Sequence, residues 1–518
     1  MSRGSVTAHP ESQEPHRHPR TFRSGRAEYR AVLGLFIVFA VSRVLYGLAG
    51  VRFDTAVPLR GYMHFIDVRL LQHDLWNSLW HFHAQPPLFN LFLGMVLHLP
   101  GSHGAWFHVF FVTMGAALTV TMFLLMRELG VSVGLAFVTT ALFVVLPVTV
   151  LYENFLLYTY PVALLLLVSG LFLVRYLRTR RPLYGFVFFG ALAALVLLRG
   201  TFHLAWLLAV AVGILIFARP RSHRALALLL IPVIAAVFWY GKNWVQFGIT
   251  SSSSWAGMNL AKVTLQQAPR AELEDLVRRG ELSRQALIVP FSAPEVYQPL
   301  PRRTGIAVLD EHRKTGGAIN YNHMVYVKVS DRYFDDAVRF IRAHPTQYTR
   351  TVGYSFRFFW LPGSDWRSER PITDGLDRFL NRFLFLQPRG YFSHELHGYT
   401  SPVSTYAPDL AQMAWGPVLV YLAVWVTSIS AAWAVLRRKQ LADRARTVTI
   451  AFLGLTVLYA TVVSNAFDVG ENNRFRFETD PVVWVLFVVL LARLAHGAST
   501  RFARRRIPPN SEVLQDAR

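Results

Sequence analysis

The sequence contains no cysteine and few charged residues. Without cysteine, the chain has no disulfide bonds, thiolate metal ligands, iron–sulfur cluster or cysteine nucleophile. Only 16% of the 518 residues are charged, against about 25% in a soluble globular chain, and 53% are apolar. The apolar residues lie in runs of about 18 to 24, separated by short arginine-rich segments, which is typical of a polytopic membrane protein.

Two apolar stretches are too long to be single transmembrane helices. Residues 131–174 contain one charged residue, Glu153, and a single helix of this length would measure about 65 Å. The hydrocarbon core of a bilayer is about 30 Å thick. The stretch must therefore fold back, and Glu153-Asn154 marks the turn. The same argument divides residues 183–218 at Arg199-Gly200.

These patterns predict an all-α polytopic membrane protein with about ten transmembrane helices and an extracytoplasmic α or α+β region. The expected spans are residues 31–50, 104–126, 133–152, 157–175, 183–199, 201–218, 224–241, 413–436, 447–465 and 482–498.

The arginine-rich segments predict the orientation. The chain has 53 basic and 31 acidic residues, a net charge of +22, and cytoplasmic loops of membrane proteins are enriched in Lys and Arg. With both termini in the cytoplasm, ten spans place every arginine-rich set on that side: residues 3–30, 127, 175–181, 219–224, 437–446 and 501–506. The positive charge is thus a topology signal and requires no nucleic acid partner. We expect a multi-pass protein of the bacterial cytoplasmic (inner) membrane.

The same topology divides the chain into five segments. The first span is expected to be an anchor rather than a cleaved signal peptide. An amphipathic helix is expected from Ser330-Asp331, with Phe334, Ala337, Val338 and Ile341 on one face. The segments are a disordered basic cytoplasmic tail (1–30), a transmembrane module of about seven spans with an outer loop at 51–103 (31–241), an extracytoplasmic region (242–412), a module of about three spans (413–498) and a basic cytoplasmic tail (499–518).

The polar residues that could carry chemistry fall on the outer side. A carboxylate can take a proton from an attacking hydroxyl, and arginine can hold a phosphate through two parallel hydrogen bonds. Together, these groups are suited to a reaction between a membrane-embedded anion and a polar acceptor. They are Asp54, Asp67, Asp74, the segment His83-Ala84-Gln85-Pro86-Pro87-Leu88, Glu153, Arg199, Lys242-Asn243 and the segment Glu471-Asn472-Asn473-Arg474-Phe475-Arg476.

Structural alternatives exist for each of these residues. The aspartates could solvate a loop, and Arg199 and Arg43 could extend to the membrane interface. Arg474 and Arg476 could form a local salt-bridge cluster with Glu471. For Glu153 a functional role is favoured, because placing an ionisable residue in the membrane core costs about 2.5–3.5 kcal/mol of free energy.

Metal and nucleotide motifs are weak. The segment His394-Glu395-Leu396-His397 lacks the two-residue spacer of a metalloprotease box. Gly241-Lys242 lacks the upstream glycine of a phosphate-binding loop. The sequence therefore predicts no metal ligand set and no ATP-driven pumping.

The order and sidedness of these motifs resemble the GT-C superfamily of membrane glycosyltransferases. The similar families include the dolichyl-phosphate-mannose protein mannosyltransferases, the lipid A aminoarabinose transferase and the rhizobial core-oligosaccharide transferases. Gln85-Pro86-Pro87-Leu88 stands where many members have His-Pro-Pro-Leu, and Arg199-Gly200 resembles the Lys-Gly or Arg-Gly after their fifth span. Arg474-Phe475-Arg476 with Pro481 resembles the motif of their last outer loop. The acidic pair usual in their first loop is replaced by the isolated Asp54 and Asp67.

The resemblance implies an inverting transfer of a sugar from a polyprenyl-phosphate donor to a hydroxyl of a glycan, lipid or protein. The base would be Asp67, because the 19 positions from Asp67 to Pro86 leave room for a helix from Leu70 to Trp80. The second candidate for the base is Asp54. Glu153 is a further catalytic candidate. No cofactor is implied with certainty, and a divalent metal is compatible with the chemistry. The candidates for binding the donor phosphate are Arg199, Lys242, Arg474 and Arg476.

Two other functions remain open at this point. One is a transporter or flippase of lipid-linked saccharides, which would place ionisable residues near the bilayer midplane. The other is an enzyme resembling the O-antigen ligases. For the transferase, we expect the first and last outer loops to meet at one cavity, lined by Asp67 or Asp54, Glu153 and at least one of Arg474 and Arg476.

Overall fold

The computed structural model describes residues 22–218, 222–366, 370–388, 402–437 and 443–505. These residues are mainly helical and form no β-strand; their only β-type pairings are isolated bridges between Asp54 and Phe155 and between Arg313 and Ile319. The described part of the chain therefore has the all-α fold that the sequence predicts. The β component that we left open for the region 242–412 is not seen in it.

Six helices are long and apolar enough to cross a membrane, which indicates a multi-pass membrane protein. Each coincides with an expected span. They are α1 (Phe22–Leu48), α6 (His103–Glu128), α9 (Thr159–Thr179), α12 (His223–Phe247), α19 (Trp415–Leu436) and α20 (Arg444–Phe467).

A seventh span is broken. The helices α7 (Val133–Val145) and α8 (Pro147–Glu153) meet at an angle of 62°. The break lies at Leu146, which is extended (φ −60°, ψ 136°), because the ring of a following proline disfavours helical geometry in the preceding residue. Counting this pair as one span gives seven in the described chain.

The other three expected spans are less regular. α10 (Pro182–Leu198) has 17 residues and α11 (Leu204–Ala218) has 15, so they measure about 25 and 22 Å, less than the hydrocarbon core of about 30 Å. α21 (Asn472–Arg505) is longer but carries four charged residues in its first three turns. By length and composition, the described chain thus has six or seven spanning helices, rather than about ten.

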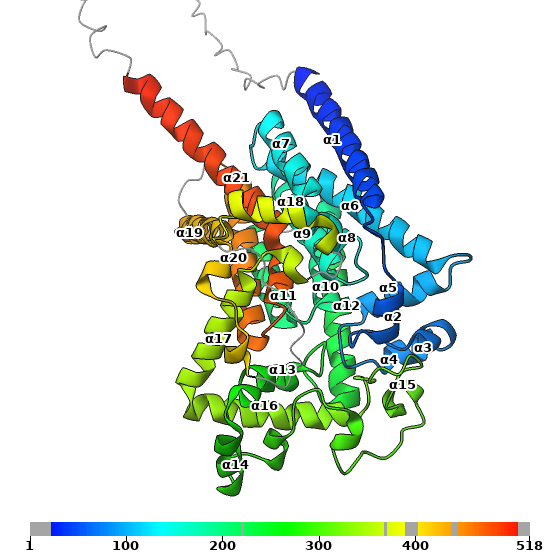
Figure 1. Cartoon of the computed structure of the whole chain (residues 1–518). Helices are drawn as coiled ribbons and strands as arrows, with labels where there is room; N and C mark the ends of the chain where they lie inside the picture. Colours follow the sequence, from blue (N-terminus) through cyan, green and yellow to red (C-terminus); the bar gives the residue numbers. More distant parts are fainter. Residues whose placement is uncertain (1–21, 219–221, 367–369, 389–401, 438–442, 506–518) are drawn as a thin grey trace, which may run out of the picture.

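The first and last described helices lie at the same end of the molecule. Figure 1 shows the start of α1 and the end of α21 there, with α13 to α16 at the opposite end. We call the first of these the termini end. Residues 22–30 and 499–505, expected in the tails, continue α1 and α21 instead. The disorder expected for residues 1–21 concerns positions outside the described chain.

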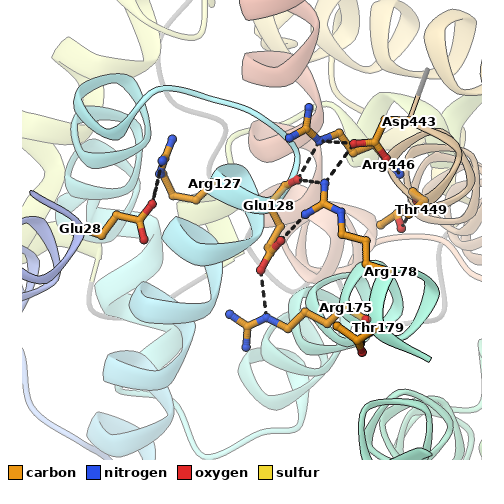
Figure 2. A network of polar contacts seen from close by, with 10 residues as sticks. Glu28, Arg127, Glu128, Arg175, Arg178, Thr179, Asp443, Arg446 and Thr449 are labelled. Carbon is orange, nitrogen blue, oxygen red and sulfur yellow. Dashed lines mark hydrogen bonds and ion pairs between the residues drawn. The ribbon is translucent and has the colours of Figure 1, made fainter. Parts of the chain in front are cut away.

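A polar network joins four helices at the termini end (Figure 2). Glu128 on α6 pairs with Arg175, at 3.2 Å, and with Arg178, both on α9. Arg178 also pairs with Asp443, the residue that caps α20, at 3.1 Å. Arg127 pairs with Glu28 on α1 at 2.7 Å. Arginine sets that the sequence assigns to one side of the membrane therefore lie together.

The loop between α1 and α6 folds into four short helices. A single helix was expected from Leu70 to Trp80, but the chain bends at Asp74. Pro87 is the N-cap of the last helix. The helices are α2 (Ala56–Gly61), α3 (Val68–His73), α4 (Leu75–Trp80) and α5 (Leu88–Leu97).

The region after α12 is also helical. The expected amphipathic helix exists as α16 (Val325–Ala343) and begins five residues earlier than predicted. It crosses α13 so closely that a Cβ at Gly257 would lie 1.8 Å from the carbonyl oxygen of Ser330. The helices are α13 (Ala256–Val263), α14 (Arg270–Arg278), α15 (Ala307–Asp310), α16, α17 (Pro345–Phe359) and α18 (Arg370–Phe383), with 3₁₀ turns at Leu265–Gln267, Arg284–Leu287, Pro294–Val296, Gly363–Trp366, Val403–Thr405 and Leu410–Gln412.

Candidate active site

A cavity of about 770 Å³ lies where the apolar bundle meets the region after α12. It is lined by residues of the first loop, such as His64 and Gln85, by Arg199 after α10, and by Glu471 and Arg474 of the last loop. The segments expected to form the first and last outer loops therefore meet at one cavity, and Arg474 lines it as predicted. Asp67, Asp54 and Glu153, also expected there, are not among its described lining residues.

Arg474 is a buried cation at the wall of this cavity, with 2% of its side chain exposed. Its Nε and Nη2 atoms donate hydrogen bonds to one carboxylate oxygen of Glu471, at 3.0 and 2.6 Å. Its Nη1 donates to the hydroxyl of Thr159 at 3.3 Å. The guanidinium group is thus fixed in position.

Glu471 remains ionised next to Arg474. Burial raises the pKa of this carboxyl group, but the positive charges of Arg474 and Lys262 outweigh that effect, and the pKa is lowered to about 2. Such a weakly basic carboxylate is better suited to holding an arginine than to taking a proton from a hydroxyl.

Arg199 approaches the same place from another helix. It is the C-cap of α10 and is extended (φ −141°, ψ 119°), so its side chain leaves the helix. Its guanidinium lies 5.2 Å from the Tyr158 ring and 4.4 Å from the Phe475 ring. The guanidinium of Arg474 lies 5.7 and 4.7 Å from the same two rings. Two arginines therefore converge on one part of the cavity, instead of one extending toward the lipid interface.

A second acidic group faces the cavity. Asp468 follows α20, and one of its carboxylate oxygens lies 2.7 Å from the Nζ atom of Lys262 and accepts a hydrogen bond from the backbone of Val469. About a quarter of its side chain is exposed. Sequence analysis missed both Asp468 and Lys262. Asp468 follows the expected span 447–465 on the outer side, so the sidedness argument could have found it.

One wall of the cavity is aromatic. Trp255, Phe291 and Tyr321 pack edge to face, with ring centroids 5.2 to 5.8 Å apart. His64 lies 5.5 Å from the Trp255 ring. Burial and the nearby charge of Arg474 lower the pKa of His64 to about 3, so this imidazole is neutral at physiological pH.

The first-loop aspartates do not line this cavity, as far as the described residues show. Asp67 caps α3 by accepting a hydrogen bond from the backbone of Arg69 at 2.9 Å. It also accepts from the backbone and hydroxyl of Thr315. Asp54 accepts from the backbone of Ala56 at 2.9 Å. Both aspartates therefore have structural partners. Asp67 is buried rather than solvating a loop, and it also joins the first loop to Thr315 in the region after α12.

Glu153 is likewise placed away from this cavity. Only 1% of its side chain is exposed, and it forms a two-pronged ion pair with Arg43 of α1, at 2.8 and 2.5 Å. The hydroxyl of Tyr160 donates a third hydrogen bond to it at 3.1 Å. Glu153 therefore neutralises Arg43 inside the bundle, and Arg43 does not extend to the interface.

Lys242 and His83 hold the first loop in place. The Nζ atom of Lys242 donates to the carbonyl oxygens of Trp80 and Phe82, at 2.9 and 3.1 Å, where α4 ends. The Nδ1 atom of His83 lies 2.9 Å from the hydroxyl of Ser254. Of His83, Gln85, Pro86 and Pro87, Gln85 alone lines the cavity.

Arg476 points away from Arg474. Successive helical residues are rotated by about 100°, so positions i and i+2 lie on nearly opposite faces of α21. The Nη1 atom of Arg476 donates to the carbonyl oxygen of Phe359 at 3.1 Å, and its Nε donates to Asp480 at 3.4 Å. The two arginines, expected at one site, therefore belong to different cavities.

Among the described residues, no three His, Asp or Glu side chains are close enough together to hold a metal ion. Residues 394–397, whose pattern resembles a metal-binding box, lie outside the described chain.

No family model, curated protein or solved structure that was compared with the chain matches it. The function is therefore inferred from the cavity and its residues.

Proposed function

We propose that the chain is a membrane glycosyltransferase that moves a sugar from a polyprenyl-phosphate donor to a hydroxyl acceptor, with inversion. The observation that carries the proposal is the convergence of Arg199 and Arg474 on one pair of aromatic rings in a cavity at the end of an apolar bundle. A lipid phosphate that reaches this place would meet two arginines, which bind phosphate oxygens in pairs.

The proposed chemistry assigns one task to each group. The acceptor oxygen attacks the anomeric carbon, and the bond from that carbon to the phosphate oxygen breaks. The electron pair stays on the lipid phosphate, whose growing charge Arg199 and Arg474 stabilise. Asp468, the cavity carboxylate that does not hold Arg474, takes the acceptor proton. Glu471 positions Arg474 without touching the substrate.

The proposal includes the finer topology. We propose that α10, α11 and α21 also cross the membrane, giving about ten spans, and that the termini end faces the cytoplasm of a bacterium. The arginine network of Figure 2 at that end supports this orientation. Reporter fusions at residues 312 and 518 should then lie on opposite sides, and reporters on one side would contradict it.

A reconstitution assay tests the activity. Purified full-length protein in lipid vesicles is supplied with a panel of polyprenyl-phosphate sugars and acceptors, and released polyprenyl phosphate is measured. Release that requires both substrates supports the transferase. Movement of the intact lipid-linked sugar across the vesicle, with no release, would identify a transporter instead.

A matched pair of variants tests the site. Arg474→Lys keeps the charge but loses the planar fork, so kcat/KM should fall by about 10²–10³, as when one transition-state donor is lost. Arg476→Lys is the control, because Arg476 is also buried in α21 but lines a different cavity. Its kcat/KM per folded molecule should stay within about threefold. Equal losses in both variants would show that the site is misplaced.

Asp468→Asn tests the base. The amide keeps the shape of the side chain but is not basic, so kcat should fall by about 10²–10⁴ with folding intact. An active Asp468→Asn variant would refute this assignment.

A further inference from the structure

Helix α18 has the reverse of the usual amphipathic arrangement. Leu376, Phe379 and Phe383 are 48%, 59% and 65% exposed, and Arg378 and Arg382 are exposed beside them, whereas Asp377 and Asn381 are buried. A surface helix of a soluble protein turns its apolar face toward the core. Exposed Phe and Leu side chains with arginines beside them are expected where a helix lies at the surface of a membrane.

The position of α18 agrees with that environment. It lies across the bundle next to α8 (Figure 1). The carboxylate of Asp377 interacts electrostatically with Tyr46, close to the end of α1. α18 therefore lies near the level at which the first spanning helix ends, on the cavity side of the membrane.

Behind α18 lies a second cavity of about 260 Å³, formed with α7, α8, α19 and α21. Its lining on α21 begins at Arg476 and ends at Leu491, a rise of about 22 Å. Charged and amide groups line it near the start of α21, and farther along α21 the lining is apolar, with residues such as Phe487 and Val488. The cavity therefore runs from a polar end into the hydrocarbon region.

The polar end contains a hydrogen-bond donor that lacks an acceptor. Asn381 is 4% exposed, it lines the cavity, and its Nδ2 atom has no hydrogen-bond partner among the described residues. An unpartnered buried donor costs about 1–3 kcal/mol, so an acceptor from a ligand would stabilise it.

The surrounding charges indicate what kind of acceptor fits. Asp377 already accepts a hydrogen bond from Thr373 at 2.9 Å, and Asp480 accepts from Tyr421 at 2.9 Å and from Arg476. Two carboxylates next to one arginine disfavour a further anion. A neutral acceptor, such as an ester carbonyl, matches this end better than a phosphate does.

We propose that the second cavity holds one acyl chain of a glycerophospholipid, whose ester carbonyl accepts a hydrogen bond from Asn381. The polar end lies near the membrane boundary and the apolar end lies deeper, which is the orientation of a lipid in that leaflet. The cavity is smaller than the roughly 300–1,000 Å³ pockets that take whole drug-sized ligands, so it suits one chain rather than a complete lipid. This site is separate from the proposed transfer site and does not depend on it.

Photolabelling tests the proposal. The full-length protein is reconstituted in phosphatidylethanolamine–phosphatidylglycerol vesicles that contain a phosphatidylethanolamine with a diazirine near the end of one acyl chain. Label mapped by mass spectrometry should concentrate on the α21 residues that line the cavity, such as Phe487, at least fivefold above the exposed lipid-facing residues of α19.

Two variants and one control complete the experiment. Val488→Trp fills the cavity and should reduce the cavity label at least fivefold, whereas Val426→Trp, the same change on the exposed face of α19, should leave it unchanged. Asn381→Leu removes the donor without narrowing the cavity and should reduce the label about threefold. The proposal is overturned by cavity label no stronger than on α19, by label unaffected by Val488→Trp, or by displacement of the label by undecaprenyl phosphate at equal concentration.

Discussion

The ion pair between Glu153 and Arg43 gives the sharpest prediction about stability. Both Nε and Nη2 of Arg43 donate to the Glu153 carboxylate, and Glu153 is almost fully buried. Glu153→Gln would leave the guanidinium without a counter-charge inside the bundle. We therefore expect a large loss of stability, although the substitution barely changes the volume of the side chain.

The expected magnitude follows from the burial of the pair. Removing one partner of a buried ion pair costs about 3–5 kcal/mol, because the other charge stays uncompensated. An exposed pair contributes about 0–1 kcal/mol. Replacing both partners with apolar residues, in Arg43→Met with Glu153→Leu, should cost at least 2 kcal/mol less than the sum of the single changes Arg43→Met and Glu153→Leu.

Unfolding in mixed micelles, followed by tryptophan fluorescence, measures these free energies. The double variant also separates structure from catalysis, since it should retain transfer activity per folded molecule. If Glu153→Gln lowers the free energy of unfolding by less than about 1 kcal/mol, the pair is solvated rather than buried. If the double variant folds but has no activity, Glu153 has the catalytic role that the sequence favoured.

Two further predictions concern the first loop. Asp67→Asn should lower the free energy of unfolding by about 1–3 kcal/mol, because the cap of α3 and the bonds from Thr315 weaken. The kcat per folded molecule should stay within about threefold, whereas a fall of about 10² or more with unchanged stability would make Asp67 the base. Burial and then the charge of Lys242 lower the pKa of His83 to about 3, so the unfolded chain binds a proton at this residue below about pH 6.5 and the folded chain does not. His83 therefore makes stability fall as the pH drops from about 6.5 toward 3, by up to about 1.4 kcal/mol per pH unit. When the free energy of unfolding is measured at pH 7.5, 6.5 and 5.5, its dependence on pH should be weaker in His83→Phe. An unchanged dependence would contradict the buried, neutral state of His83.

The sequence by itself determined the class of fold and the position of most helices. Long apolar runs have few alternatives to a membrane helix, because every buried backbone group must be bonded within its own segment. The fold-back at Glu153 followed from comparing helix length with bilayer thickness. The sequence did not reveal that α10 and α11 have only 17 and 15 helical residues, since helix ends depend on local bonds.

Only the tertiary structure decided which charges meet. Glu153 and Arg43 are 110 positions apart, and Asp67 and Thr315 are 248 apart, so nothing in the local pattern of either segment identifies its partner. The local motif Arg474-Phe475-Arg476 was ambiguous for another reason. Once the segment is helical, its two arginines face opposite sides, and only the packing of α21 assigns one to each cavity. The sequence shows where charge is located, whereas the fold determines which counter-charge neutralises it and which charges remain for a ligand.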